Sequence, residues 1–429
     1  MLQSYTYRLP LLMAAIPAFA CVSSPARASE IDDLKAQVQF LMKRVNELER
    51  KLNRTPTAHR SSSQTPHPTP VSAPVATPSP NMPAPEKNPV RSGNEKVRLT
   101  LRGHVNRALL YADNGSRTRL FHVDNSSSPT RLSFNGETHL NSQTQIGSNF
   151  EVQMESNASS SVSMTKQAKS ASDVTFAKRK LELYAKNARY GQLWVGQGET
   201  ASYGGTETDL SGTAVVGLGA NVDAMAGGLL YQTKAGGKTG PQIQETYAGM
   251  DGLGRADRIR YDTPTFNGFS MAVSHVDGDS RDAGLRFSGE VNKTQIQAAL
   301  TAAKQRGQFS QYTATVSTLF TNGISLTGSS GLRHFKLSNK KDSHLLHGKI
   351  GYQLNIWDWG KTAFAADIGH VKSLQQNKDA ARTYGLMAVQ NIDEIATEIY
   401  FGLRWHHLKR LETPYKPIFA SMLGARVKF

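Results

Sequence analysis

Basic side chains recur at alternate positions in runs that are otherwise apolar, and this spacing could line a water-filled wall with positive charge. In residues 97–106 polar and apolar side chains alternate, and Arg98 and Arg102 are among the polar ones. Arg131 begins a second run of this kind. An arginine that faces lipid costs about 2–4 kcal/mol at the bilayer midplane. We therefore expect these three arginines to face a hydrated lumen, where opposed charges would act on passing ions.

Three other patterns in the sequence fall short of chemical sites. Residues 237–239 (GKT) lack the glycine that a phosphate-binding loop has five residues earlier, where Gln232 stands. The aspartates of residues 277–282 could ligate Ca²⁺ in an outer loop, but they lack a full ligand series, which favours a solvated loop. The adjacent histidines at 406–407 would point to opposite faces of a strand. We expect no metal site, no cofactor and no enzymatic activity.

Residues 97–429 must form the elements that position the charges, and their period is two. Alternating runs recur at lengths near the roughly 9–11 residues that a tilted strand needs to cross a bilayer. Connections that look short fall near residues 140–143, 187–191, 263–267, 292–294, 321–323, 356–360 and 392–396. The pattern predicts an all-β fold, a closed antiparallel transmembrane barrel of sixteen strands, with both barrel ends on the side of the short turns.

The alternative fold is a soluble β-sandwich or a barrel outside the membrane, whose second face is wet. Against it, nearly every run carries one charged or polar face and one apolar face over more than 300 residues. Trp357 and Trp359, near Tyr352 and Phe364, are typical of an interfacial aromatic girdle. No stretch of the mature chain approaches the roughly 20 apolar residues of a spanning helix, which excludes a helical membrane protein.

Residues 1–28 are typical of an export signal. Arg8 precedes an apolar run, and Ala26-Arg27-Ala28 offers a small-x-small cleavage site. The single cysteine, Cys21, lies in the piece that would be removed. An earlier cleavage would leave Cys21 at the new terminus for lipidation, but alanine stands where leucine is expected three residues before it.

Residues 29–54 predict a short α-helical coiled coil, because apolar residues repeat every seven in steps of three and four. The seam consists of Ile31, Leu34, Val38, Leu41, Val45, Leu48 and Leu52. The seam alone favours a dimer. Residues 44–49, however, resemble the pattern of short trimeric coiled coils, so we favour a trimer. The other alternative is an amphipathic helix that docks on its own domain. Residues 55–96 hold ten of the 18 prolines and predict an extended linker.

Several stretches of the barrel resemble Gram-negative general porins. The last five residues, ARVKF, are similar to the family's carboxy-terminal strand, whose final aromatic, here Phe429, is read by the outer-membrane assembly machinery. Residues 123–137 resemble the family's second strand, and residues 257–269 resemble the turn before its seventh. The coiled coil and linker depart from plain general porins and are similar to trimeric porins with a periplasmic extension.

The resemblance implies a homotrimer of sixteen-stranded barrels, each narrowed by a long loop folded inward over about residues 199–256. Residues 203–210 resemble the family's acidic constriction segment, which assigns its carboxylates to Glu207 and Asp209.

The basic wall that faces this loop in the family falls on His104, Arg131 and Lys180 in this sequence. His104 stands where lysine is usual, so one wall charge would depend on pH. Gln197 stands where the family commonly has arginine, which would weaken the basic cluster.

These features predict a water-filled channel for passive diffusion of ions and small hydrophilic solutes in the outer membrane of a Gram-negative cell, with the extension in the periplasm. The barrel carries 38 Lys and Arg against 27 Asp and Glu, a net +11 that hints at anions, although selectivity belongs to the constriction. A substrate-selective porin, or an adhesin, enzyme or cell-wall tether that uses the barrel as an anchor, is the alternative. The expected partners are further copies of the chain, outer-membrane lipid or lipopolysaccharide, the barrel assembly machinery and peptidoglycan, but not nucleic acid.

Overall fold

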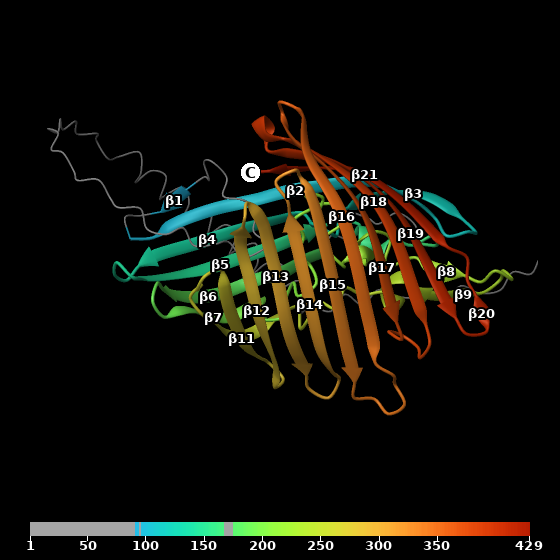
Figure 1. The fold of residues 1–429 in the computed structure, drawn as a ribbon, viewed down its shortest axis with the longest axis horizontal. Coiled ribbons are helices and arrows are strands. Elements are labelled where there is room, and N and C mark those ends of the chain that lie inside the picture. The colour runs from blue at the N-terminus through green and yellow to red at the C-terminus, as the bar shows by residue number, and fades with distance from the viewer. Residues whose placement is uncertain (1–90, 94–95, 167–174) are drawn as a thin grey trace, which may run out of the picture. The chain divides into compact units, whose positions relative to one another are not determined.

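The computed structural model describes residues 91–93, 96–166 and 175–429, and these are mostly β-strands (Figure 1). The strands are β1 (Arg91–Gly93), β2 (Arg98–Asp113), β3 (Thr118–Asp124), β4 (Arg131–His139), β5 (Thr144–Glu155), β6 (Thr175–Asn187), β7 (Gly191–Glu199), β8 (Leu230–Gln232), β9 (Thr239–Gln242), β10 (Arg255–Asp262), β11 (Phe269–Val276), β12 (Ser280–Val291), β13 (Thr294–Gln305), β14 (Phe309–Leu319), β15 (Ile324–Phe335), β16 (Ser343–Trp357), β17 (Gly360–Lys372), β18 (Ala380–Ile392), β19 (Thr397–Arg410), β20 (Thr413–Pro414) and β21 (Ile418–Lys428).

The helical segments of this part of the chain are single turns: η1 (Ser159–Ser161), η3 (Val222–Ala224), α2 (Ile243–Thr246) and η4 (Asp393–Ile395). Among the described residues, none of the helices has the length and apolar character needed to cross a membrane. The predicted signal peptide, the coiled-coil seam and all but the end of the predicted linker lie outside the described residues.

The strands close into one antiparallel barrel. Neighbouring strands pair in chain order, and β2 pairs with β21 to close the ring. β3 and β4 pair with successive halves of β2, so together they fill one strand position that is interrupted at residues 125–130. β7 pairs directly with β10, because β8 and β9 form a hairpin within the intervening segment. The predicted sixteen-stranded barrel is therefore confirmed, with β1 and β20 as short additions to β2 and β19.

One end of the barrel has short turns throughout. Its connections are residues 140–143, 188–190, 263–268, 292–293, 320–323, 358–359 and 393–396, each within two residues of the sequence-based prediction. The described chain enters the barrel and leaves it at this end, since Arg98 opposes Glu137 and Lys428 opposes His104. Because outer-membrane barrels have short periplasmic turns, this is the periplasmic end.

The outer face of the barrel carries a band of exposed apolar side chains between aromatic rings. In β16, exposed Leu346 and Ile350 alternate with buried inward side chains. Trp357 and Trp359 stack at a periplasmic turn, with ring centroids 5.3 Å apart. Phe419, on β21, lies towards the other end of the barrel, and its ring centroid is 5.2 Å from that of Trp405. Exposed apolar side chains between two aromatic belts are the surface that acyl chains solvate.

Part of the barrel interior is dry, which differs from the sequence-based expectation. Inward side chains of β18 and β21, among them Met387, Val389 and Met422, are buried in an apolar cluster. They share this cluster with Val216 and Met225 of the segment between β7 and β10. A segment folded into a barrel must bury its own apolar side chains, and the inner wall is the surface available. The expectation of a polar inner face on nearly every strand is therefore wrong for β18 and β21.

The last residue is fixed at the seam where the barrel closes. Phe429 and Gly103 exchange two backbone hydrogen bonds, of 2.9 and 3.0 Å. The Phe429 ring lies where a Cβ on residue 103 would stand, 2.7 Å from that position. Glycine at 103 therefore leaves room for the aromatic terminus.

Candidate pore constriction

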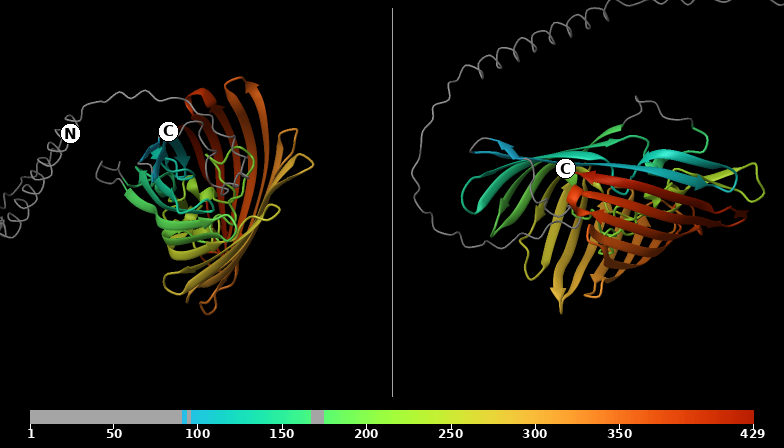
Figure 2. Two further views of the ribbon diagram at one scale, coloured as in Figure 1. Left: turned by 90° about the vertical axis from the view of Figure 1, so that its left-hand side faces the viewer. Right: turned by 90° about the horizontal axis from the view of Figure 1, so that it is seen from above.

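Most of the long loop, residues 200–254 between β7 and β10, lies inside the barrel (Figure 2), whereas its β8–β9 hairpin extends past the end opposite the short turns (Figure 1). In its first quarter, the Leu210 amide donates to Ser317 Oγ on β14 at 2.9 Å. The Leu210 carbonyl accepts from Gln353 Nε2 on β16 at 2.6 Å. Beside it, Asp209 pairs with Lys349 of β16 at 2.7 Å, and both side chains are fully buried. The long loop is thus fixed to the wall opposite β4 and β5.

Further hydrogen bonds fix the start of the long loop and the stretch around Val215. At its start, the Ser202 amide donates to Asp282 of β12 at 2.9 Å. The Ala201 carbonyl accepts from Arg286 of the same strand at 2.9 Å. Further along, the Val215 carbonyl accepts from Asn125 Nδ2 at 2.7 Å, in the interruption between β3 and β4. The loop therefore crosses the interior from one wall to another and leaves a passage on one side.

That passage is a cavity of about 690 Å³ lined mainly by β2, β4 to β7, β21 and the long loop. Its lining contains more positive than negative side chains. The basic ones are Arg102, Arg131, Arg179, Lys180, Lys186, Arg255, Arg426 and Lys428, and the acidic ones are Glu137, Glu151, Glu199, Glu207, Asp209 and Asp251. A hydrated space with charges of both signs on its walls imposes a field on ions that enter it.

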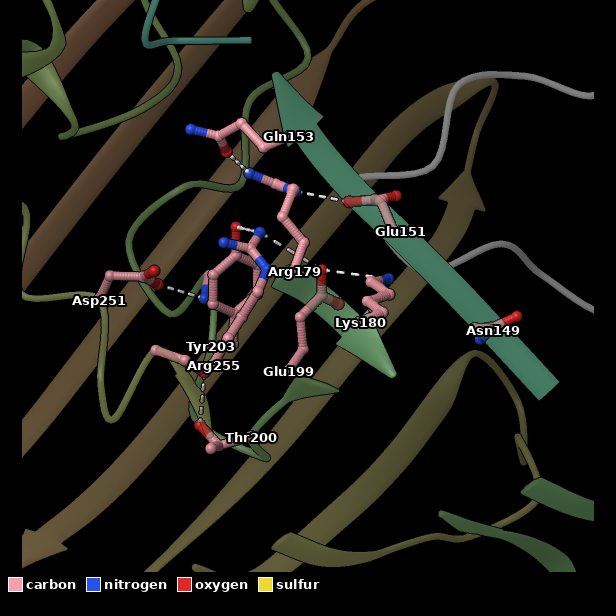
Figure 3. A network of polar contacts seen from close by, with 12 residues as sticks. Asn149, Glu151, Gln153, Arg179, Lys180, Glu199, Thr200, Tyr203, Asp251 and Arg255 are labelled. Atoms are coloured by element: carbon pink, nitrogen blue, oxygen red, sulfur yellow. Dashed lines mark hydrogen bonds and ion pairs between the residues drawn. The ribbon is translucent and has the colours of Figure 1, made fainter. Parts of the chain in front are cut away.

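The wall of the cavity carries a network of charged and polar side chains (Figure 3). Arg179 of β6 forms an ion pair with Glu151 of β5 and donates to Gln153 Oε1 at 2.7 Å. Lys180 lies 3.3 Å from Glu199, and Arg255 lies 3.5 Å from the same carboxylate. Shared pairs of this kind hold the side chains in place against the walls.

A β-bulge explains why two consecutive basic residues line one cavity. Successive strand residues normally point to opposite faces. The β5–β6 register shifts by one residue, because Glu151 opposes Lys180 while Val152 opposes Lys178. Arg179 is the extra residue, so both it and Lys180 line the cavity.

The long loop contributes aromatic and acidic groups to the cavity. The Arg255 guanidinium lies 4.3 Å from the centre of the Tyr203 ring and also donates to its hydroxyl. The Gly204 amide donates to the Asp251 carboxyl. Burial, together with the neighbouring Glu207 carboxylate, raises the pKa of Asp251 well above its ordinary value. Asp251 therefore adds less negative charge to the cavity than its residue type suggests.

The structure places the sequence-predicted basic residues in three different settings. Arg102 and Arg131 line the cavity, and among the described residues no hydrogen bond or ion pair holds either guanidinium. Arg98 lies nearer the periplasmic end, half exposed and 3.8 Å from Glu137. His104 is buried, and its Nε2 donates a hydrogen bond of 2.8 Å to the Pro129 carbonyl. Lys180 is the predicted residue that joins the charge network.

The two predicted acidic residues also differ from each other. Glu207 lines the cavity with 6 % of its surface exposed. Asp209 is buried in its pair with Lys349. Although burial opposes its ionisation, Lys349 and hydrogen bonds from Ser211 lower the pKa of Asp209 below its ordinary value. Its contact is therefore one that anchors the long loop.

Sequence reasoning missed Arg179, Glu151, Glu199, Tyr203 and Arg255 as cavity residues. Glu151 could have been found, because it alternates with apolar residues in the run that predicted β5. The aspartates of residues 277–282 separate, since Asp282 is buried against Ser202 while Asp279 pairs with Arg306. No cluster of three metal-ligating side chains occurs in the part of the chain that the structure describes.

A family model described as Gram-negative porin matches residues 71–410. Three solved structures share the fold over their whole length. An anion-selective porin from Comamonas acidovorans is 16% identical, with 78% of this chain and 100% of that chain covered and a TM-score of 0.55. In-vitro folded OmpT of Vibrio cholerae in its trimer form is 10% identical, with 78% and 100% of the two chains covered and a TM-score of 0.52. OmpF of Salmonella typhi in complex with daunomycin is 13% identical, with 79% and 100% covered and a TM-score of 0.51. A search of curated proteins gives no match.

Proposed function

This chain belongs to the Gram-negative porin family, and we propose that it is an outer-membrane channel for passive diffusion of ions and small hydrophilic solutes. The observation that carries the proposal is the cavity of about 690 Å³ within a closed barrel, with charges of both signs on its walls and apolar side chains on the outside. The family and the fold point to a channel without catalytic activity.

Liposome swelling tests this function. Vesicles that contain the purified, folded chain should swell in sugars at a rate that falls as the sugar becomes larger, because the cavity sets a size limit. Swelling that is no faster than that of empty vesicles, for every sugar, would reject diffusion as the function.

We further propose a preference for anions. The cavity lining carries eight Lys and Arg against six Asp and Glu, and the raised pKa of Asp251 removes part of the negative charge. The unpaired guanidinium groups of Arg102 and Arg131 leave their fields available to ions. The similarity to a porin that is itself anion-selective supports this preference.

The assembly that we propose is a homotrimer, with residues 29–54 as a periplasmic coiled coil and residues 55–96 as its linker. One of the similar structures is a trimer form, which supports this number. Deleting residues 29–96 should lower the melting temperature of the trimer or the retention of the protein on the cell wall. If both measurements are unchanged, the extension has neither role.

A further inference from the structure

Two aromatic rings lie on the inner wall of the barrel, on the periplasmic side of the charge network. Tyr184 of β6 opposes Trp194 of β7, and their ring centroids are 5.0 Å apart. Both residues line the cavity, as Lys186 does. Lys180 of the network precedes Tyr184 by four residues on the same strand, about 13 Å at roughly 3.3 Å per residue. The rings therefore form a surface of their own between the network and the periplasmic mouth.

Contacts with the neighbouring strands hold the aromatic pair in place. The Trp194 indole Nε1 donates to Asp262 of β10 at 2.6 Å, and Arg260 donates to the same carboxylate at 2.8 Å. The Tyr184 ring lies over Gly147 of β5, where a Cβ would stand 2.3 Å from it. Tyr184 is buried, whereas Trp194 is partly exposed. Trp194 is thus the ring that offers its surface to the cavity.

One cation beside the rings is available to a ligand. Lys186 follows the aromatic residue of β6 by two positions and shares its inward face. Its cross-strand neighbours are two neutral amides, Gln145 and Gln192. Within the described residues, no hydrogen bond or ion pair reaches Lys186. The acidic side chains around the rings already have partners, namely Glu137 with Gln145 and Arg98, Glu182 with Asn149 and Arg258, and Asp262 with Trp194 and Arg260.

These groups together fit an anion that carries a flat ring. Aromatic rings attract each other in offset or edge-to-face arrangements, beyond the effect of the area that they bury. An ammonium group forms charge-assisted hydrogen bonds with a carboxylate. Lys186 and Tyr184 are two residues apart, about 6.6 Å at roughly 3.3 Å per residue, a span that a benzoate-sized molecule covers. A sugar acid fits less well, because its hydroxyl groups need hydrogen-bond partners and the carboxylates around the rings are engaged.

We propose that the periplasmic part of the passage holds a binding subsite for aromatic carboxylates. The ring of the ligand lies against Trp194, and its carboxylate pairs with Lys186. This inference rests on the proposed diffusion of solutes and adds a class of solute that the channel binds during passage. An aromatic carboxylate dwells at the rings, whereas acetate or chloride meets the cation alone.

Single-channel recording of the full chain in KCl at neutral pH, with sodium benzoate on both sides of the bilayer, tests the subsite. Benzoate should reduce the current in a saturable way, and acetate at the same concentration should not, because it lacks the ring. Trp194→Leu should weaken the apparent affinity for benzoate roughly 2-fold to 12-fold, which is what an aromatic pair contributes beyond its buried area. Lys186→Gln should also weaken it, because the charge-assisted hydrogen bond is lost.

Trp194→Phe separates the ring from the indole donor. Both Trp194→Phe and Trp194→Leu lose the hydrogen bond to Asp262, but phenylalanine keeps an aromatic ring and should bind benzoate nearer to the wild type. Trp359→Leu and Lys293→Gln change exposed side chains at periplasmic turns outside the cavity, so these matched controls should bind benzoate as the wild type does.

Equal benzoate affinities of Trp194→Leu and Trp194→Phe would overturn the subsite. So would acetate or glucuronate that reduces the current at the concentration at which benzoate does. If the wild type conducts KCl and benzoate leaves its current unchanged, the subsite is rejected while the channel function stands. A folded, inserted chain without any current would instead reject the proposed function itself.

Discussion

Removing the two unpaired guanidinium groups of the cavity, in Arg102→Gln/Arg131→Gln, should make the channel markedly less selective for anions. The cavity of about 690 Å³ has the volume of a sphere roughly 5.5 Å in radius, so an ion at its centre lies about 7 Å from each guanidinium charge. At that distance two unit charges in water interact by about 0.6 kcal/mol. At 0.1 M salt the Debye length is about 10 Å, which reduces this energy to roughly 0.3 kcal/mol.

Each lost charge disfavours an anion and favours a cation by the same amount. The ratio of anion to cation permeability therefore changes by about 0.6 kcal/mol per arginine and about 1.2 kcal/mol for both, which is roughly a sevenfold fall. Glutamine keeps much of the side-chain length, so the cavity volume should change little.

Reversal potentials in planar bilayers, under a KCl gradient, measure this ratio. Arg306→Gln is the matched control, because Arg306 is exposed in a turn and pairs with Asp279. An unchanged reversal potential in the folded double variant, or an equal change in the control, would refute the assignment of selectivity to Arg102 and Arg131.

Three further predictions concern the long loop, its pH response and the terminus. Lys349→Ala leaves the Asp209 carboxylate buried without its partner, at a cost of about 3–5 kcal/mol, and should increase both protease cleavage within residues 200–254 and single-channel noise. In both measurements Asp209→Asn/Lys349→Met should lie nearer the wild type. Lys349→Ala channels that are quiet and resist the protease would contradict the role of this pair as an anchor of the long loop. Because the pKa of Asp251 is raised, this residue adds its negative charge to the cavity only above the ordinary carboxyl range of pH, so anion selectivity should fall as pH rises. Reversal potentials measured between about pH 4 and pH 9 should show this fall in the wild type and not in Asp251→Asn. A fall that persists in Asp251→Asn belongs to another group. Phe429→Ser removes the ring that lies on Gly103 and should lower the fraction of folded barrel in outer membranes several-fold relative to the control Leu423→Ser. Equal yields of the two variants would mean that the terminal aromatic has no special part in assembly.

The barrel was predictable because each strand repeats one simple signal. Apolar side chains at every second residue, with turns at regular spacing, require an even number of strands and a closed ring in lipid. The same alternation directed Arg102 and Arg131 to the interior, where the structure places them.

Other features escaped the sequence because they break the alternation or depend on distant contacts. The bulge at Arg179 reverses the parity of β6, and no residue type marks it in advance. The pair between Asp209 and Lys349 joins residues 140 apart in the chain. Apolar inward residues such as Met387 and Met422 become intelligible only once Val216 and Met225 of the long loop are seen against them.

Single-channel recording of the purified chain in planar bilayers tests the central claim most directly, namely that the barrel has an apolar outside and a hydrated passage within. We expect stepwise currents whose conductance rises in proportion to the conductivity of the bulk salt solution. A folded chain that inserts into the bilayer and carries no current at any salt concentration would contradict the account.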